Sequence, residues 1–176
     1  MPEAIENYQP LKIGEKFRKQ AWKVWTISAL VVFLWVFLII FAPFAQENNW
    51  TQISAPIYKF FSYLCHQMSE RSFHFHEHQF AVCARCFGVY FGLFFGFLIY
   101  PLMRKVEEIE PLPRFWLFLA LIPIGIDWSL GVFGIWENTH LSRFITGMIL
   151  GIACAVFIVP ALIELVRLLT LKKLTK

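Results

Sequence analysis

The chain has 176 residues, of which 58% are apolar and 18% aromatic, and it includes 20 Phe. Soluble domains are about half apolar, so this composition excludes an ordinary soluble domain and predicts a single membrane domain over residues 1–176. The net charge of +4 does not indicate a nucleic-acid partner, because the basic residues flank the apolar stretches instead of forming a stripe among aromatics.

Four apolar stretches are long enough to cross a lipid bilayer as helices. The first spans about residues 24–45 without a charge, and a helix of that length covers a hydrocarbon core of about 30 Å. The others span about 84–103, 115–135 and 142–169. Residues 46–82 form a loop, in which the aromatics, Lys59 and Pro56 of residues 53–64 predict a short interfacial or re-entrant helix. We therefore expect an all-α integral membrane protein with four transmembrane helices.

Lys and Arg concentrate on one side of the predicted helices. The first 23 residues hold five, residues 103–114 hold three and the tail from Arg167 holds four, while the opposite side has four in all. Basic residues favour the cytoplasmic side of a membrane. We therefore expect a multi-pass protein of the cell (inner or plasma) membrane, with both termini in the cytoplasm and residues 46–86 and 136–143 on the outer face.

Small residues recur every four positions in the second and fourth stretches. They are Gly88, Gly92 and Gly96 in one and Gly147, Gly151 and Ala155 in the other. This spacing lets two membrane helices approach closely, so we assign the glycines to packing and not to chemistry. Cys154, in the middle of the fourth stretch, is expected to be a packing residue too.

The segment from Cys65 to Cys86 holds three Cys and four His. Cys83 and Cys86, at the start of a helix, put two sulfurs on one face, close enough for one metal ion. Cys65 and one His would complete the Cys₃His pattern of structural zinc. His66 and His78 are the first candidates for this His. Since ligation by the adjacent Cys65 and His66 strains the backbone, His66 could instead support a ligand. We expect zinc or another transition metal.

Two other interpretations of the thiols stay open. Cys83 lies near a helix N-terminus with Arg85 between the thiols, and both features favour a reactive thiolate. The protein would then be a membrane thiol-disulfide oxidoreductase that passes electrons between Cys83, Cys86, Cys65 and a quinone or partner protein. Alternatively, two of the thiols form an inert structural disulfide.

The loop also contains alternating histidines. His74, His76 and His78 alternate with Phe75 and Glu77, so an extended chain would put the three imidazoles on one side. Such a row could recruit a metal ion, and the alternative is a solvated polar loop that is rich in His. Among the three, His78 is the nearest in sequence to the Cys83 pair.

Asp127 lies in the outer half of the third predicted helix. A carboxylate there is costly unless it faces the bundle interior and has a partner, and we expect Arg143, at the start of the fourth helix, to be that partner. The pair is either functional or a buried structural ion pair. In a catalytic site, Asp127 would act as acid or base and Arg143 would bind an anion. Asn138 or Thr139 is expected to cap the fourth helix.

Several runs of residues together resemble a known signature. They are Cys65-His66-Gln67, Arg71-Ser72-Phe73 and Val82-Cys83-Ala84-Arg85-Cys86-Phe87-Gly88-Val89-Tyr90. The runs resemble those of an uncharacterised family of predicted prokaryotic polytopic membrane proteins, a domain of unknown function. The pattern continues with Asp127 and with Arg143-Phe144-Ile145-Thr146-Gly147, so the resemblance covers residues 65 to about 151. Ala81 departs from it, because the family often has Pro there.

The resemblance implies which residues belong together, but no reaction. These are the three thiols, His66, Arg71, Arg85, Asp127 and Arg143. From the residues we expect a metal site on the outer face beside an Asp/Arg pocket, with metal-assisted chemistry on a lipid-borne substrate. The alternatives are the thiol-disulfide oxidoreductase and a metal carrier or assembly factor without turnover. Whether the protein is an enzyme stays open, as does a membrane partner.

Overall fold

The computed structural model describes residues 10–110 and 112–174. Its helices are α1 (Pro10–Glu47), α2 (Thr51–Ser62), α3 (Ala84–Met103), α4 (Phe115–Val132) and α5 (His140–Leu174), with a short 3₁₀ turn, η2 (Ser69–Arg71). Two strands, β1 (His74–Phe75) and β2 (His78–Gln79), pair antiparallel. Within these described residues, four helices (α1, α3, α4 and α5) are long and apolar enough to cross a membrane. The chain is thus an all-α integral membrane protein.

The predicted elements are confirmed, with differences at their ends. The second predicted span coincides with α3, and α2 is the predicted short helix. α4 ends at Val132, three residues before the predicted end, and the chain turns away through Gly134 at φ 66°. α1 begins 14 residues before the first predicted span, and α5 ends five residues after the fourth. At about 1.5 Å per residue, each of these two helices is longer than the hydrocarbon core.

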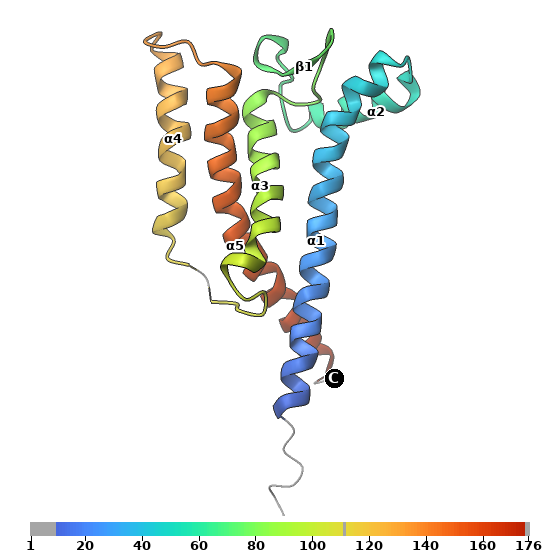
Figure 1. The fold of residues 1–176 in the computed structure, drawn as a ribbon, viewed down its shortest axis with the longest axis vertical. Helices are drawn as coiled ribbons and strands as arrows, with labels where there is room; N and C mark the ends of the chain where they lie inside the picture. Colours follow the sequence, from blue (N-terminus) through green and yellow to red (C-terminus); the bar gives the residue numbers. More distant parts are fainter. Residues whose placement is uncertain (1–9, 111, 175–176) are drawn as a thin grey trace, which may run out of the picture.

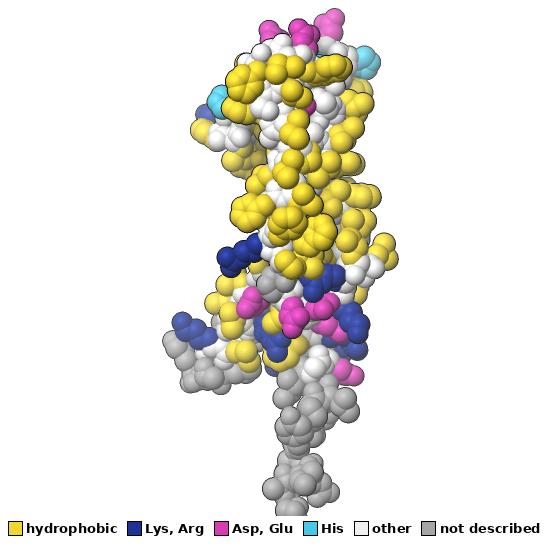
Figure 2. All heavy atoms as spheres, turned by 90° about the vertical axis from the view of Figure 1, so that its left-hand side faces the viewer, with side chains coloured by type: hydrophobic (Ala, Val, Ile, Leu, Met, Phe, Trp, Pro, Cys, Tyr) yellow, Lys and Arg dark blue, Asp and Glu magenta, His cyan; other side chains and the backbone are white. Residues whose placement is uncertain are grey.

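The helices run side by side, and the loops at their two ends differ (Figure 1). α3 and α5 both begin at the end that carries α2 and the β1–β2 hairpin, while the start of α1 and the end of α5 lie at the opposite end. We call the first of these the loop end. On the face that carries α4, hydrophobic side chains cover the middle of the molecule, and charged side chains gather toward both ends (Figure 2). This distribution is typical of a protein surrounded by lipid.

The centre of the bundle is the contact between α3 and α5. A Cβ atom added to Gly88 or Gly92 of α3 would collide with the backbone of α5 at Phe144 or Met148. In the same way, a Cβ on Gly147 or Gly151 of α5 would collide with the backbone of α3. The predicted packing role of these glycines is therefore confirmed, and the two helix backbones touch along most of the interface.

α1 covers this pair on one side, and α4 stands on the other. Near the loop end, buried side chains of α1, α2, α3 and the loop before α3 form one hydrophobic cluster, which includes Ile39, Phe61, Val82 and Phe87. α4 packs against α5. Ala120 and Asp127 are the buried residues of α4, whereas α3 has seven buried residues. α4 is therefore a peripheral helix.

Candidate metal centre

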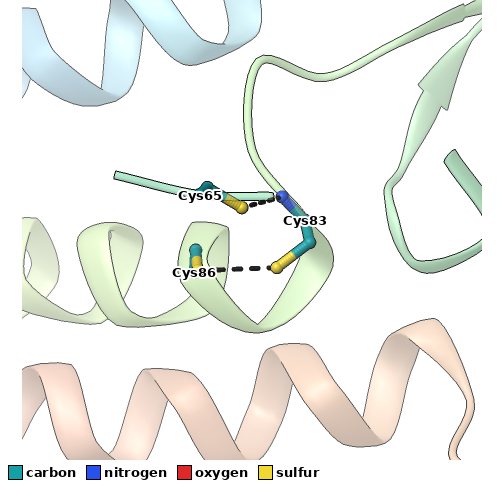
Figure 3. A group of neighbouring side chains, drawn as sticks. All are labelled: Cys65, Cys83 and Cys86. Atoms are coloured by element: carbon teal, nitrogen blue, oxygen red, sulfur yellow. Dashed lines mark hydrogen bonds between the residues drawn. The ribbon is translucent and has the colours of Figure 1, made fainter. Parts of the chain in front are cut away.

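Three cysteine side chains meet at the loop end. Cys65 follows α2, Cys83 is the N-cap residue of α3, and Cys86 lies in the first turn of α3. Their sulfur atoms all lie within 4.8 Å of one another, and the side chains converge on one point (Figure 3). The backbone N–H of Cys83 donates to the Cys65 sulfur at 3.3 Å, and the sulfurs of Cys83 and Cys86 are 3.4 Å apart. The structure thus brings together the three thiols that the sequence analysis singled out.

The donor set fits a soft metal ion. Tetrahedral coordination with Zn–S bonds of about 2.3 Å separates two sulfurs by about 3.8 Å, whereas a disulfide bond brings them to about 2.05 Å. The Cys83–Cys86 distance of 3.4 Å is nearer to the first value. Thiolates prefer zinc and copper(I) over hard cations. The three residues could therefore hold such an ion with a small adjustment of their side chains.

One of the thiols is predisposed to lose its proton. The pKa of the buried Cys65 thiol lies below its usual value, because the side chains of Cys83 and then of Cys86 donate hydrogen bonds to its sulfur. Desolvation opposes this shift but does not reverse it. The lowered pKa favours the Cys65 thiolate, which is the form of cysteine that binds a metal ion.

Gln67 holds the two halves of the cluster in register. Its backbone has a φ of 50°, and its side-chain amide donates to the carbonyl oxygens of Tyr58 and Ala81, both at 2.8 Å. These bonds tie α2 to the segment just before α3, which sets Cys65 against Cys83. The sequence analysis assigned Gln67 no role, although its place in the Cys-His-Gln run was a signal.

The structure does not bring a histidine into the thiol group. His66 is exposed and lines the cavity beside Cys65, but its ring nitrogens are not part of the group within 4.8 Å. The Nε2 atom of His78 lies 3.2 Å from a carboxylate oxygen of Glu47, at the end of α1. The fourth ligand therefore stays a prediction for His66, and the contacts of His78 point it toward α1.

Of the two interpretations of the alternating histidines, the row of three imidazoles does not form, because the chain does not stay extended. His76 has a φ of 50° and lies at the turn of the β1–β2 hairpin. In this hairpin His74 pairs with Gln79, and Phe75 pairs with His78. Paired residues share a face, so His74 and His78 lie on opposite faces. His74 contacts the Ser69 hydroxyl at 3.0 Å, on the far side from Glu47.

Asp127 is buried in α4, and its partner differs from the predicted one. Its carboxylate accepts hydrogen bonds from the side chains of Arg85 and Asn138, whereas the sequence analysis paired it with Arg143. Close packing of α3 on α5 carries the first turn of α3 toward α4, so the Arg85 guanidinium reaches the carboxylate. Thr139 is the helix cap, because its Oγ1 accepts from the Ser142 N–H at 3.1 Å.

A cavity of about 230 Å³ lies against the thiol cluster. All three cysteines line it, together with His66, Arg71, Arg85 and Arg143. These arginines come from η2, α3 and α5. Arg143 is predicted from the residues to bind an anion. Arg71 and Arg85 belong to the same group only by the family resemblance.

Comparison with known proteins agrees with that resemblance. Residues 65–157 match the family described as "Predicted membrane protein (DUF2085)". An uncharacterised protein of Methanocaldococcus jannaschii is 37% identical over 150 residues, which cover 84% of this chain and 96% of the relative. An uncharacterised protein of Methanothermobacter thermautotrophicus is 40% identical over 96 residues, which cover 54% of this chain and 85% of the relative. No solved structure matches significantly. The chain belongs to the predicted membrane protein family DUF2085.

Proposed function

We propose that the protein is a membrane metalloprotein that binds one zinc ion through Cys65, Cys83 and Cys86 and uses it in catalysis. The observation that carries this proposal is the convergence of three thiols on the wall of a cavity. Structural zinc has four protein ligands, whereas catalytic zinc has three and keeps one position for water or substrate. Within the described part of the chain, the group of candidate ligands holds three residues, so the proposal leaves the fourth position to water or substrate and gives His66 another role.

The site lies on the outer face of the cell membrane in this proposal. The segments at the opposite end hold twelve of the sixteen Lys and Arg residues, and such a bias marks the cytoplasmic side. The beginning of α1 and the end of α5 lie together at that end (Figure 1), which is consistent with two cytoplasmic termini. A site at the loop end would meet substrates of the outer leaflet or of the space beyond it.

The residues around the cavity have separate roles in the proposed chemistry. Zinc, when bound, supplies a Lewis acid that polarises a substrate oxygen or activates water. Asp127 accepts hydrogen bonds from Arg85 and Asn138, so we assign it to positioning Arg85 and not to proton transfer. Arg143 lines the cavity and binds an anionic part of the substrate. His66, exposed at the rim, is the candidate for moving a proton.

Elemental analysis of the detergent-purified protein tests the metal site. We expect one zinc per chain, which the double substitution Cys83→Ser, Cys86→Ser removes. Cys154→Ser is the matched control, because Cys154 lies within α5 and outside the thiol group, and it should retain the zinc. A protein that purifies without metal, and that lacks two thiols in a denatured thiol count, would contradict the proposal.

A second candidate is a membrane thiol-disulfide oxidoreductase. The 3.4 Å separation of the Cys83 and Cys86 sulfurs favours it, because a small movement would allow a disulfide bond. Alkylation trapping in living cells distinguishes the two functions. Thiols that change between reduced and oxidised states with the supply of quinone support the oxidoreductase, whereas thiols that stay reduced and shielded by metal support the zinc site. A metal carrier would instead load and release its ion reversibly.

A further inference from the structure

Three arginines surround the cavity beside the thiols. We propose that Arg71, Arg85 and Arg143 form a binding site for a phosphate group, which they hold next to the cysteine cluster. The substrate of the proposed zinc enzyme would then contain a phosphate group. The reaction of this substrate rests on the proposed function. Phosphate binding itself depends only on the arginines.

The geometry places three positive charges at one cavity. Arg85 lies in the first turn of α3, Arg143 in the first turn of α5 and Arg71 in η2, and each lines the same space. Like charges gathered at one site need an anion to offset their repulsion.

The charges are only partly neutralised by the protein. Asp127 pairs with Arg85. Among the described residues, the guanidinium groups of Arg71 and Arg143 make no hydrogen bond or ion pair, and the Nε of Arg85 is buried without a partner. A half-buried guanidinium without an acceptor is unfavourable. Three guanidinium charges against the Asp127 carboxylate and the Cys65 thiolate leave the cavity with an excess of one positive charge, which favours a bound anion such as a phosphate group.

The helix ends add to this attraction. α3 and α5 both begin at the cavity (Figure 1), and the N-terminus of a helix favours a negative charge. Arginine binds phosphate through two parallel hydrogen bonds, which makes it the preferred side chain for that group. The cavity of about 230 Å³ is smaller than the roughly 300–1,000 Å³ of sites for drug-sized ligands. It therefore suits one phosphate group better than a whole nucleotide.

Arg71 is held in place, although its side chain is exposed. The imidazole of His140, at the start of α5, donates from Nε2 to the carbonyl oxygen of Glu70 at 3.2 Å. Phe73 follows Arg71 by two residues and packs against α5. Its ring centroid lies 5.8 Å from that of His140 and 5.9 Å from that of Phe144. These contacts fix the segment of Arg71 to α5, the helix that carries Arg143.

The rim of the cavity favours a phosphate that is carried on a lipid. Leu64 and Met68 line the cavity and are about half exposed. Their apolar side chains would contact the glycerol or acyl part of a lipid whose phosphate is bound by the arginines. A soluble phosphate compound presents the same phosphate chemistry without this apolar part.

Binding measurements with two probes test the site. The detergent-purified full chain is titrated with dihexanoyl phosphatidic acid and, separately, with inorganic phosphate, while dihexanoyl phosphatidylcholine serves as the probe with a blocked phosphate. We expect saturable binding of phosphatidic acid, weakened about tenfold or more by Arg143→Gln or by Arg71→Gln, since a bidentate charged pair is worth roughly 1.5–3 kcal/mol. Lys59→Gln is the matched control. Lys59 is an exposed basic residue of α2 outside the cavity, so its loss should leave binding unchanged.

The outcomes separate the two sources of phosphate and the two proposals. Arginine-dependent binding of both probes with equal affinity supports a soluble phosphate compound, and stronger binding of phosphatidic acid supports a lipid. Binding that neither arginine substitution weakens, or no binding of either probe, overturns the phosphate site. Arg71→Gln keeps the test decisive if Arg143→Gln does not fold, because Arg71 is exposed. Zinc is measured on the same samples, so arginine-dependent binding without zinc would retain the phosphate site and reject the zinc enzyme.

Discussion

Two neighbours of α5, the helices α3 and α4, pack against it in different ways. α3 lies against α5 with its backbone in contact at glycines, whereas α4, which is at least as hydrophobic, leaves most of its residues exposed. Hydrophobicity does not draw helices together in lipid, because acyl chains are as apolar as leucine, and close packing at small residues does. The apolar content of a helix thus predicts that it spans the membrane but not which helix it contacts.

The residues of the site are likewise divided between the tightly packed α3–α5 pair and the peripheral helix α4. The α3–α5 pair carries Cys83, Cys86, Arg85 and Arg143 on a rigid frame, while α4 contributes Asp127 through polar contacts with Arg85 and Asn138. α4 is therefore attached to the site chiefly by groups that neutralise charge. Changes at the glycines should disrupt the frame, and changes at the polar groups should loosen only α4.

The largest effect is expected from a side chain inserted between α3 and α5. Gly92→Leu should destabilise the protein by about 3 kcal/mol or more, because its Cβ would collide with the backbone at Met148. Gly125→Leu on α4 is the control, since a Cβ there meets nothing within 4 Å, and it should change stability by no more than about 0.5 kcal/mol. Thermal unfolding in detergent measures both. Equal losses at the two glycines would break the proposed distinction between the helices.

A smaller effect is expected when the ion pair that reaches α4 is broken. Asp127→Asn should cost about 2 kcal/mol, less than the roughly 3–5 kcal/mol of a fully buried pair, because the Arg85 side chain is 23% exposed. The double variant Asp127→Asn, Arg85→Gln should lose less stability than the sum of the losses of the two single variants, since the two residues interact. Ser129→Ala, which removes only a hydrogen bond within α4, is the control. Strictly additive losses in thermal unfolding would argue against the pair.

The smallest effects come from two adjacent residues that serve different helices. Asn138 donates to Asp127 of α4, while Thr139 caps α5, and replacing either by Ala should cost about 1 kcal/mol. In the Asp127→Asn background, the effect of Asn138→Ala should shrink, whereas that of Thr139→Ala should persist. Thermal unfolding measures both losses, in the wild-type protein and in the Asp127→Asn variant. If the loss from Thr139→Ala shrank in the variant instead, our assignment would be contradicted.

The spans and the thiol cluster could be predicted because their signals are local. Each span is a continuous apolar run, and Cys83 and Cys86 share a helix face by their spacing alone. Cys65 joins the group because a third Cys and one His complete the Cys₃His pattern of structural zinc. The glycine spacing likewise predicted that two helices approach closely, although it did not state that α3 pairs with α5.

The remaining contacts depend on how distant segments pack. Arg85 reaches Asp127 only because α3 lies tightly on α5, and no pattern near either residue distinguishes Arg85 from Arg143. The turn at His76 occurs at a residue with positive φ, which is uncommon for histidine, so the alternating His residues suggested an extended chain. Arg71 joins the cavity through contacts of η2 with α5, which are separated by about seventy residues in the sequence.

The pairing of α3 with α5 has a consequence for biosynthesis. The whole of α4 lies between the two helices in the sequence, so α3 leaves the ribosome and enters the membrane before its partner exists. The three cysteines, all within residues 65–86, are then complete, while Arg143 has not yet been synthesised. The nascent protein therefore passes through a stage at which all three thiols of the cluster are present while the face of α3 that will contact α5 is still uncovered.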